Sequence, residues 1–208
     1  KGIIENVINK LNVNNWRKNV MYRGFGISDI PTRVGGSKTK EYLYWVRMLD
    51  RCYDEKLLVR RKTYQDCEVS EQFRRLSDFS SWIRSQVGFN DSGFALDKDI
   101  LIKGNKIYSP DRCCLVPREI NSLFTLGNAT RGGYPLGVRY ITLGTYHSSI
   151  HIGKKTKHLG VYQNMEDAFM AYKRVKEDHI KFIAEKWRGR VDENVYEKLM
   201  SWEIDIDD

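Results

Sequence analysis

One short stretch in the middle of the chain carries oxygen ligands of the kinds that hold a divalent ion. The stretch is GFALDKDILIKGNKIYSPDRCCLVPREIN, residues 93–121, and it contains Asp97, Lys98, Asn105 and Asn121. Metal-dependent nucleases hold an ion between a carboxylate, a second oxygen ligand and a phosphate, where it stabilises the charge developing on the leaving oxygen. We predict that Asp97 and Asn121 are the two protein ligands of such an ion.

The order of apolar and turn residues in this stretch predicts two strands and a helix. Asp97 lies on the first strand, the loop KGNK reverses the chain, and CCLV forms the returning strand. Pro117 suits the first turn of the following helix, PREIN, because an N–H at that position has no intrahelical partner. Asn121 then lies one turn into the helix and faces back toward the hairpin, where its amide oxygen can reach an ion at Asp97.

This strand, loop, strand and helix resembles the HNH, or His-Me finger, motif, which is the ββα-metal fold of phage and intron-associated homing endonucleases. The resemblance implies that Asp97 and Asn121 bind the metal, that Asn105 is the structural amide of the loop, and that Lys98 stands where the family has its general-base His. YWVRMLDRCYDEK and TYQDCEVSEQF also resemble phage HNH-like proteins, so the resemblance covers most of the chain.

The family resemblance implies an activity as well as a fold. We expect an endonuclease that uses Mg²⁺ or Mn²⁺ to hydrolyse phosphodiester bonds in double-stranded DNA, with Asp97, Lys98 and Asn105 as its catalytic residues. It would act in the cytoplasm of an infected bacterial host, without a membrane and without a small-molecule cofactor.

Lys98 leaves two mechanisms and two other functions open. A nearby divalent cation disfavours the ammonium form, so Lys98 can act as a base. Alternatively it grips phosphate while a metal-bound hydroxide attacks. Besides the endonuclease, a second possible function is a catalytically lapsed HNH-like DNA-binding protein or regulator. A third possible function is an RNA- or ribosome-binding basic protein.

A purely structural role for the same side chains is a further alternative. Asp97 and Asp99 would then pair with Arg112 or Arg118, and Asn121 would cap its own helical turn.

The C-terminal part predicts three short strands followed by a long amphipathic helix. The strands lie in GVRYI, YHSSIHIGKK and KHLGVY, and the helix is NMEDAFMAYKRVKEDHIKFIAEKW with Asn164 as its N-cap. Successive side chains of a strand point to opposite faces. The face toward the helix would carry Val138, Tyr140, Ile150, Ile152, Leu159 and Val161. The opposite face and the hairpin turn would carry the DNA contacts, which we predict to be Arg139, Ile141, Ser149, His151, Lys154, Lys155, Lys157 and His158.

This segment resembles the Apetala or ethylene-response-factor type of DNA-binding domain, which also occurs in phage endonucleases. The matching residues are Gly137, Val138, Arg139, Ile150, Leu159, Gly160, Tyr162, Met165 to Ala168, Ala171 and Tyr172. The resemblance implies that the outer face of the sheet enters the major groove of duplex DNA. Several DNA-facing Trp and Arg positions of the family are Ile, Ser and His here, so its base specificity does not carry over.

The charge of the chain is unevenly distributed. The net charge is +8, and residues 131–190 alone carry 12 Lys and Arg against 5 Asp and Glu, whereas residues 191–208 carry 1 against 7. A basic segment of this density favours a phosphate-rich partner. The acidic tail is either a solvated end or a segment that folds back and competes with DNA for the basic surface.

The complete fold prediction is α+β, a ββα-metal nuclease domain followed by a three-stranded antiparallel sheet with one helix. Before the hairpin we expect helices over 40–53 and over 70–87, the second with Ser70 as its N-cap. The predicted divisions are an N-terminal helix and extended arm (1–40), an HNH-like nuclease domain (41–126), a linker (127–136), the DNA-binding domain (137–190) and an acidic tail (191–208).

The cysteines and histidines favour no metal site of their own. Cys52, Cys67, Cys113 and Cys114 contain no C-x-x-C pair, so we expect reduced thiols over a zinc site or disulfides. All four histidines lie after residue 146, and alternation places only His151 and His158 on a common face. No apolar run approaches the roughly 20 residues that span a bilayer, and no signal peptide is visible.

Overall fold

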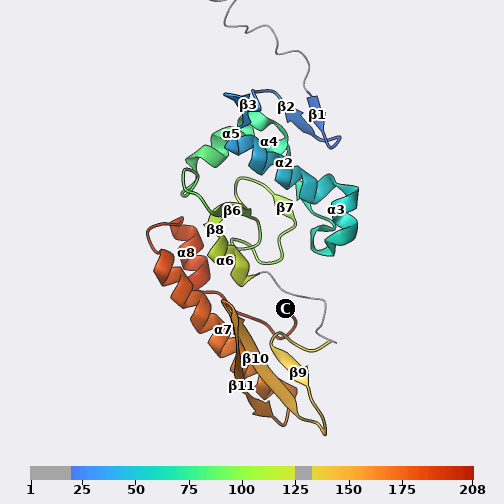
Figure 1. Ribbon diagram of the computed structural model, residues 1–208, viewed down its shortest axis with the longest axis vertical. Helices are drawn as coiled ribbons and strands as arrows, with labels where there is room; N and C mark the ends of the chain where they lie inside the picture. Colours follow the sequence, from blue (N-terminus) through green and yellow to red (C-terminus); the bar gives the residue numbers. More distant parts are fainter. Residues whose placement is uncertain (1–19, 125–132) are drawn as a thin grey trace, which may run out of the picture. The chain divides into compact units, whose positions relative to one another are not determined.

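The structure is a computed structural model, and it describes residues 20–124 and 133–208 (Figure 1). The chain divides into two compact units, Lys1–Leu115 and Val116–Asp208. Both combine helices with small sheets, so the α+β class is confirmed. The predicted N-terminal helix and part of the predicted linker lie outside the described residues.

The described part of the first unit begins with two small antiparallel hairpins, where an extended arm was expected. They pair β1 (Val20–Tyr22) with β2 (Gly26–Ser28), and β3 (Arg33–Val34) with β4 (Ser37–Lys38). A Cβ built on Gly26 would overlap the side chain of Leu49 and lie 2.6 Å from that of Trp45. Only glycine therefore lets β2 approach the helix that carries those side chains.

That helix is α2 (Lys40–Tyr53), and it confirms the predicted range. Thr39 caps it by accepting a hydrogen bond from the N–H of Tyr42. Trp45, Met48 and Leu49 are fully buried, and the Trp45 indole N–H donates to the carbonyl of Phe73 at 2.9 Å. Two short helical segments, α3 (Glu55–Arg60) and the 3-10 turn η2 (Lys62–Tyr64), follow.

The single helix predicted over 70–87 is wrong, because the chain forms two helices there, α4 (Glu71–Arg74) and α5 (Leu76–Ser85). Arg75 between them has extended backbone angles and forms a β-bridge with Ile27. This tertiary bridge interrupts a helical pattern that local periodicity alone would continue. Ser70 occupies the N-cap position, but its side chain makes no capping hydrogen bond.

Four short strands complete the first unit. β5 (Glu68–Val69) pairs in parallel with β7 (Ile107–Tyr108), and β6 (Phe94–Asp97) pairs with β8 (Cys114–Pro117), the strand within which the division between the units falls. Alternate residues of the hairpin, Leu96, Lys98 and Ile100, are buried. Cys52, Cys67, Cys113 and Cys114 are all buried free thiols.

The second unit contains the predicted three-stranded sheet, with α7 lying along one of its faces (Figure 1). The antiparallel order is β11 (Lys155–Tyr162), β10 (Tyr146–Ile152), β9 (Val138–Tyr140). α7 spans Met165–Trp187, and Asn164 caps it as predicted by accepting from the N–H of Asp167 at 2.8 Å. A Cβ at Gly137 would overlap the Tyr172 ring, so β9 approaches α7 only with glycine there.

Two further helices pack against α7. α6 (Arg118–Leu123) is tied to it through Glu119, which accepts from Lys186 at 2.7 Å and from the Trp187 indole at 2.7 Å. α8 (Glu193–Met200) buries Val195 and Leu199 completely. These contacts place α6 in the second unit, so the division lies upstream of the predicted linker at 127–136.

The predicted acidic tail, residues 191–208, contains α8, and the residues after α8 lie against α7. Ile204 is 3% exposed, its N–H donates to Glu177, and its carbonyl accepts from Lys173. The Trp202 ring packs on Phe124 with centroids 4.4 Å apart. This end of the tail is therefore held by side chains of α7. Among the described residues, no helix is both long and apolar enough to cross a membrane.

Candidate functional site

The carboxylate of Asp97 lies at the end of β6 and closes a tight turn. Its Oδ1 accepts hydrogen bonds from the backbone N–H groups of Asp99, at 2.8 Å, and Ile100, at 2.9 Å. Burial raises the pKa of Asp97, and the two N–H donors only partly offset that effect. A carboxylate held in this way is a concentrated negative charge that the fold alone leaves incompletely compensated.

Lys98 points into the interior of the hairpin, and it is 5% exposed. Its ammonium group donates to Oδ1 of Asp99 at 2.6 Å and to the backbone carbonyl of Asn105. Asp99 therefore forms an ion pair with Lys98, and Arg112, one of the partners considered for it, forms an ion pair with Asp111. A phosphate grip or a general base at Lys98 would require these internal contacts to open.

Asn105 holds the loop of the hairpin with three hydrogen bonds. Its amide donates to the carbonyls of Lys98, at 2.8 Å, and Ile107, at 2.7 Å, and its oxygen accepts from the N–H of Ile107 at 3.0 Å. The side chain is 6% exposed. Asn105 thus fixes the backbone of the residue next to Asp97 and acts as a positioning residue for that carboxylate.

Arg51 is a further member of this site that sequence reasoning missed. It reaches from α2 to donate to the Leu96 carbonyl at 3.2 Å, and its guanidinium lies 5.6 Å from the centre of the Tyr64 ring. Burial alone would lower its pKa, but Tyr108, Tyr64 and the charge of Asp97 raise it. The sequence held one signal for Arg51, because it is a cation in the last turn of a helix that is rich in aromatic residues.

Asn121 lies on α6 and is half-buried. Asp97 and Asn121 belong to different units, so their shared ion stays a prediction. Within residues 20–124 and 133–208, no group of three His, Cys, Asp or Glu side chains is arranged to hold a metal ion. The carboxylate of Asp97 is nonetheless a ligand that Mg²⁺ favours, and Mg²⁺ commonly binds one or two carboxylates together with substrate phosphate and water.

The outer face of the sheet, meaning the face away from α7, is defined by the strand register. Arg139 pairs with His147, which pairs with Val161, and in the next rows Ser149 pairs with His158 and His151 with Thr156. Cross-strand partners share a face. The predicted residues Arg139, Ser149, His151 and His158 therefore do lie together, and Ile141 is 45% exposed beyond them.

The assignment of Val161 to the helix-facing side is wrong. Ser148 pairs with Gly160 but Ser149 pairs with His158, so β11 has a bulge at Leu159. The extra residue shifts the alternation of β11 by one position. Val161 is consequently 55% exposed on the outer face. Lys155 and Lys157 lie before the bulge, opposite Ile152 and Ile150, so the register assigns them to the helix-facing side; both remain exposed, on the edge strand of the sheet.

The expectation that only His151 and His158 share a face is also wrong. His147 lies on the outer face, and its Nε2 contacts Nδ1 of His158, with ring centroids 4.4 Å apart. Burial, the neighbouring His158 and the charge of Arg139 lower the pKa of His147. The centre of the outer face is therefore a pair of hydrogen-bonded imidazoles beside one guanidinium.

The sheet and its turns carry positive charge without any carboxylate. Residues 137–162 contain Arg139, Lys154, Lys155 and Lys157 and no Asp or Glu. All four cations are exposed. Such a field attracts a polyanion, and the imidazoles and hydroxyls among the cations can exchange hydrogen bonds with base edges.

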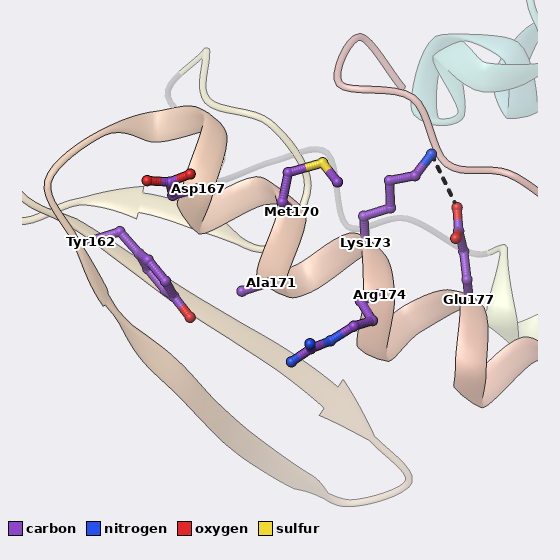
Figure 2. Close-up of a pocket in the computed structure, with 7 residues that line it drawn as sticks. All are labelled: Tyr162, Asp167, Met170, Ala171, Lys173, Arg174 and Glu177. Carbon is purple, nitrogen blue, oxygen red and sulfur yellow. Dashed lines mark ion pairs between the residues drawn. The ribbon is translucent and has the colours of Figure 1, made fainter.

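The second unit also has an open hollow of 590 Å³ on the side of α7, next to the end of β11 (Figure 2). It is lined by Tyr162, Asp167, Met170, Ala171, Lys173, Arg174 and Glu177. Figure 2 shows Lys173 and Glu177 facing each other across one turn of the helix, as an ion pair of 3.2 Å. None of the residues predicted from the sequence to bind metal or DNA lines this hollow.

In comparisons with protein-family models, curated proteins and solved structures, nothing matches this chain. The two resemblances drawn from the sequence therefore remain predictions. The function has to be argued from the geometry of the Asp97 hairpin and of the outer face.

Proposed function

We propose that the protein binds duplex DNA through the outer face of the sheet β9–β11 and cleaves it in a Mg²⁺-dependent reaction at the Asp97 hairpin. The observation that carries the proposal is the charge of the sheet: residues 137–162 hold four cations and no carboxylate. Neutralising phosphates with Lys and Arg releases condensed counterions, and this supplies most of the affinity of non-specific DNA binding.

The arrangement of side chains favours a nucleic acid over other polyanions. Arg139, the His147–His158 pair and Ser149 form two adjacent rows of donors and acceptors on one face. A two- or three-stranded sheet of this kind can enter the major groove, where each base pair presents a distinct pattern of donors and acceptors. The lysines at the β10–β11 turn would contact phosphates and set the register.

The support for hydrolysis comes from Asp97. Its desolvated carboxylate, with a pKa raised by burial, lacks a fully compensating positive charge. A bound Mg²⁺ would supply electrostatic stabilisation of the leaving oxygen. The chain itself would contribute the carboxylate of Asp97, the fixed loop of Asn105 and, in the prediction from the sequence, the amide of Asn121.

A second candidate function is a DNA-binding protein with a lapsed nuclease hairpin. The burial and internal pairing of Lys98 favour it, because a side chain turned inward to Asp99 and the Asn105 carbonyl is not placed to act as a base on an attacking water. In this case the hairpin would serve as a scaffold, and the sheet would retain its affinity for DNA.

The two candidates differ in a supercoiled-plasmid nicking assay with Mg²⁺ or with EDTA. For the nuclease we expect Mg²⁺-dependent cleavage that Asp97→Asn lowers by about 100-fold or more. The matched control is Asp91→Asn, which changes an exposed carboxylate in the same unit and should cleave like the parent. Neither substitution should change DNA affinity measured in EDTA.

Stability separates a functional loss from unfolding in this test. In Asp97→Asn, the new amide oxygen can still accept from the two N–H groups, while the desolvated charge is gone. The raised pKa of Asp97 means that the folded state loses stability as the pH rises from the ordinary carboxyl value through that raised pKa. At neutral pH, Asp97→Asn should therefore leave the free energy of unfolding equal or higher.

Each remaining outcome of these assays supports one of the candidate functions. Absence of cleavage with both Mg²⁺ and Mn²⁺, with DNA affinity intact, selects the lapsed nuclease, and cleavage gained by Lys98→His would strengthen that conclusion. Binding to duplex RNA that equals or exceeds binding to DNA would select the RNA-binding alternative. No binding to duplex DNA at low salt would overturn the proposal as a whole.

A further inference from the structure

The loop between β9 and β10 ends in an exposed apolar tip. Leu143 is 91% exposed and Ile141 is 45% exposed. Leu143 and Gly144, the central residues of the turn, both have positive φ, at 50° and 76°. Two-residue hairpin turns of this conformation favour Asn, Asp or Gly, and a left-handed backbone is unfavourable for a residue with a large side chain. Leucine is therefore a poor choice at position 143 for folding and for solubility alike.

The turn that presents Leu143 is braced. The N–H of Ile141 donates to the carbonyl of Thr145, and the N–H of Thr145 donates back to the carbonyl of Thr142, both at 2.9 Å. The N–H of Gly144 donates to the Tyr140 hydroxyl at 3.3 Å. An exposed leucine held on a braced, strained turn is an outlier of the kind that often marks a binding site.

The surroundings of the tip indicate what it meets. Ile141 and Val161 are exposed at the same end of the sheet as Leu143, and the row Arg139–His147–Val161 comes next on the outer face. The lysines of the β10–β11 turn stand at the other end of β10. A second copy of the chain docking here would bring like charges together, whereas duplex DNA offers phosphates to the cations and stacked bases to the apolar tip.

We propose that Leu143 is a wedge that inserts between two stacked base pairs when the sheet binds duplex DNA. This inference rests on the proposed function and names its binding mode. In proteins that bind the minor groove, inserted side chains such as Leu and Ile partly unstack a base step and kink the duplex, which brings more protein surface into contact; Leu143 would act in the same way from the tip of the sheet. Pyrimidine–purine steps, which unstack most easily, are the steps the wedge would select.

The test uses the full chain in EDTA, with Leu143→Asn as the variant. Asparagine suits the left-handed backbone, so the variant should fold at least as stably as the parent, as measured by thermal unfolding. Its affinity for a random-sequence duplex, measured by fluorescence anisotropy, should fall by about 3- to 10-fold. The control Val34→Asn alters another exposed apolar residue of a hairpin, 73% exposed, and should leave the affinity unchanged.

Unstacking is measured by relaxing a closed circular plasmid with a metal-independent topoisomerase in the presence of protein. The parent and Val34→Asn should shift the topoisomer distribution, and Leu143→Asn should not, even at concentrations that saturate the DNA. A parent that binds DNA without shifting the distribution, or a Leu143→Asn variant that shifts it equally, overturns the wedge and leaves DNA binding standing.

Two other outcomes are also decisive. A parent that does not bind duplex DNA overturns the wedge together with the proposed function. A change of sedimentation coefficient in Leu143→Asn without any DNA, combined with unchanged topoisomers, would assign the tip to contacts between copies of the chain and overturn the wedge.

Discussion

The Asp97 hairpin and the sheet β9–β11 differ in where their charged side chains lie and in what those side chains bind. In the hairpin, Lys98 is buried and Asp97 is half-buried, and their hydrogen bonds are made to neighbouring groups of the same loop. In the sheet, the cations are at the surface and have no carboxylate between residues 137 and 162 to neutralise them. The hairpin uses its polar groups to hold one geometry, whereas the sheet leaves its polar groups for a partner.

This contrast predicts where mutations will be felt. A buried polar group left without its partner costs the full desolvation free energy, so substitutions that remove a hydrogen-bonding partner within the hairpin should appear as lost stability. Exposed cations contribute little to folding, so changes in the sheet should appear as lost affinity and altered salt dependence.

The largest effect is expected at Asn105. Asn105→Ala leaves two carbonyls and one N–H of the hairpin without their partners and should lower the free energy of unfolding by about 2–4 kcal/mol. Urea denaturation measures it, and Asn90→Ala, at an exposed position in the same unit, is the control. A loss at Asn105 no larger than that of the control would remove the contrast, because the hairpin would then not depend on its internal hydrogen bonds.

A smaller effect, on affinity, is expected at the cations of the sheet β9–β11. Arg139→Ala should weaken binding to a preferred sequence by about 1–3 kcal/mol and relax discrimination at one base pair. Lys155→Ala should weaken all sequences alike and reduce the slope of log affinity against log salt by about 1. Anisotropy titrations over a salt series measure both.

Two results of that salt series would change the role assigned to the outer face. Equal losses on preferred and random DNA for both variants would make the face a phosphate grip only. Lys181→Ala, an exposed cation on α7, is the control and should change neither quantity, because α7 packs on the opposite face of the sheet; an equal loss there would spread the binding surface beyond the outer face.

The smallest effect is a pH dependence of stability from His147. The lowered pKa of His147, caused first by burial and then by His158 and Arg139, means that the unfolded chain takes up a proton more readily than the folded one. Stability should therefore fall as the pH drops below about 6.5 and level off below the folded pKa.

His147→Asn should flatten that fall, and thermal unfolding between about pH 5 and pH 8 measures the difference from the parent. His179, whose pKa is also lowered by burial, contributes a similar fall that the substitution does not touch. Identical pH profiles of stability for parent and variant would contradict this prediction, because protonation of His147 would then have no effect on the free energy of unfolding.

The elements predicted correctly are those with a strong local pattern. The aromatic stripe of residues 40–53 and the Asn164 cap of α7 depend on side chains within a few positions of one another, and both are found in the structure. The three strands of the sheet were recognisable for the same reason. Of the predicted site residues, Arg139, Ser149, His151 and His158 were grouped correctly because β9, β10 and the part of β11 before the bulge follow simple alternation.

The features that were missed depend on distant partners. The break at Arg75 follows from its bridge to Ile27, far away in the sequence. The exposure of Val161 and the contact between His147 and His158 follow from a bulge beside Gly160, which simple alternation does not include. Arg51 joins the Asp97 site only because α2 packs beside β6 and β7.

The sequence by itself determined the charge of residues 137–162, the periodicity of the helices in the chain and the identity of the candidate ligands. These are properties of single residues and of residues close together in the sequence. Only the tertiary structure decided that Lys98 points inward, that Asn105 ties down the loop beside Asp97, and that Leu143 stands exposed on a braced turn. The physical reason is that burial, and hence the free energy of a charge or an apolar side chain, is set by atoms brought together from remote parts of the chain.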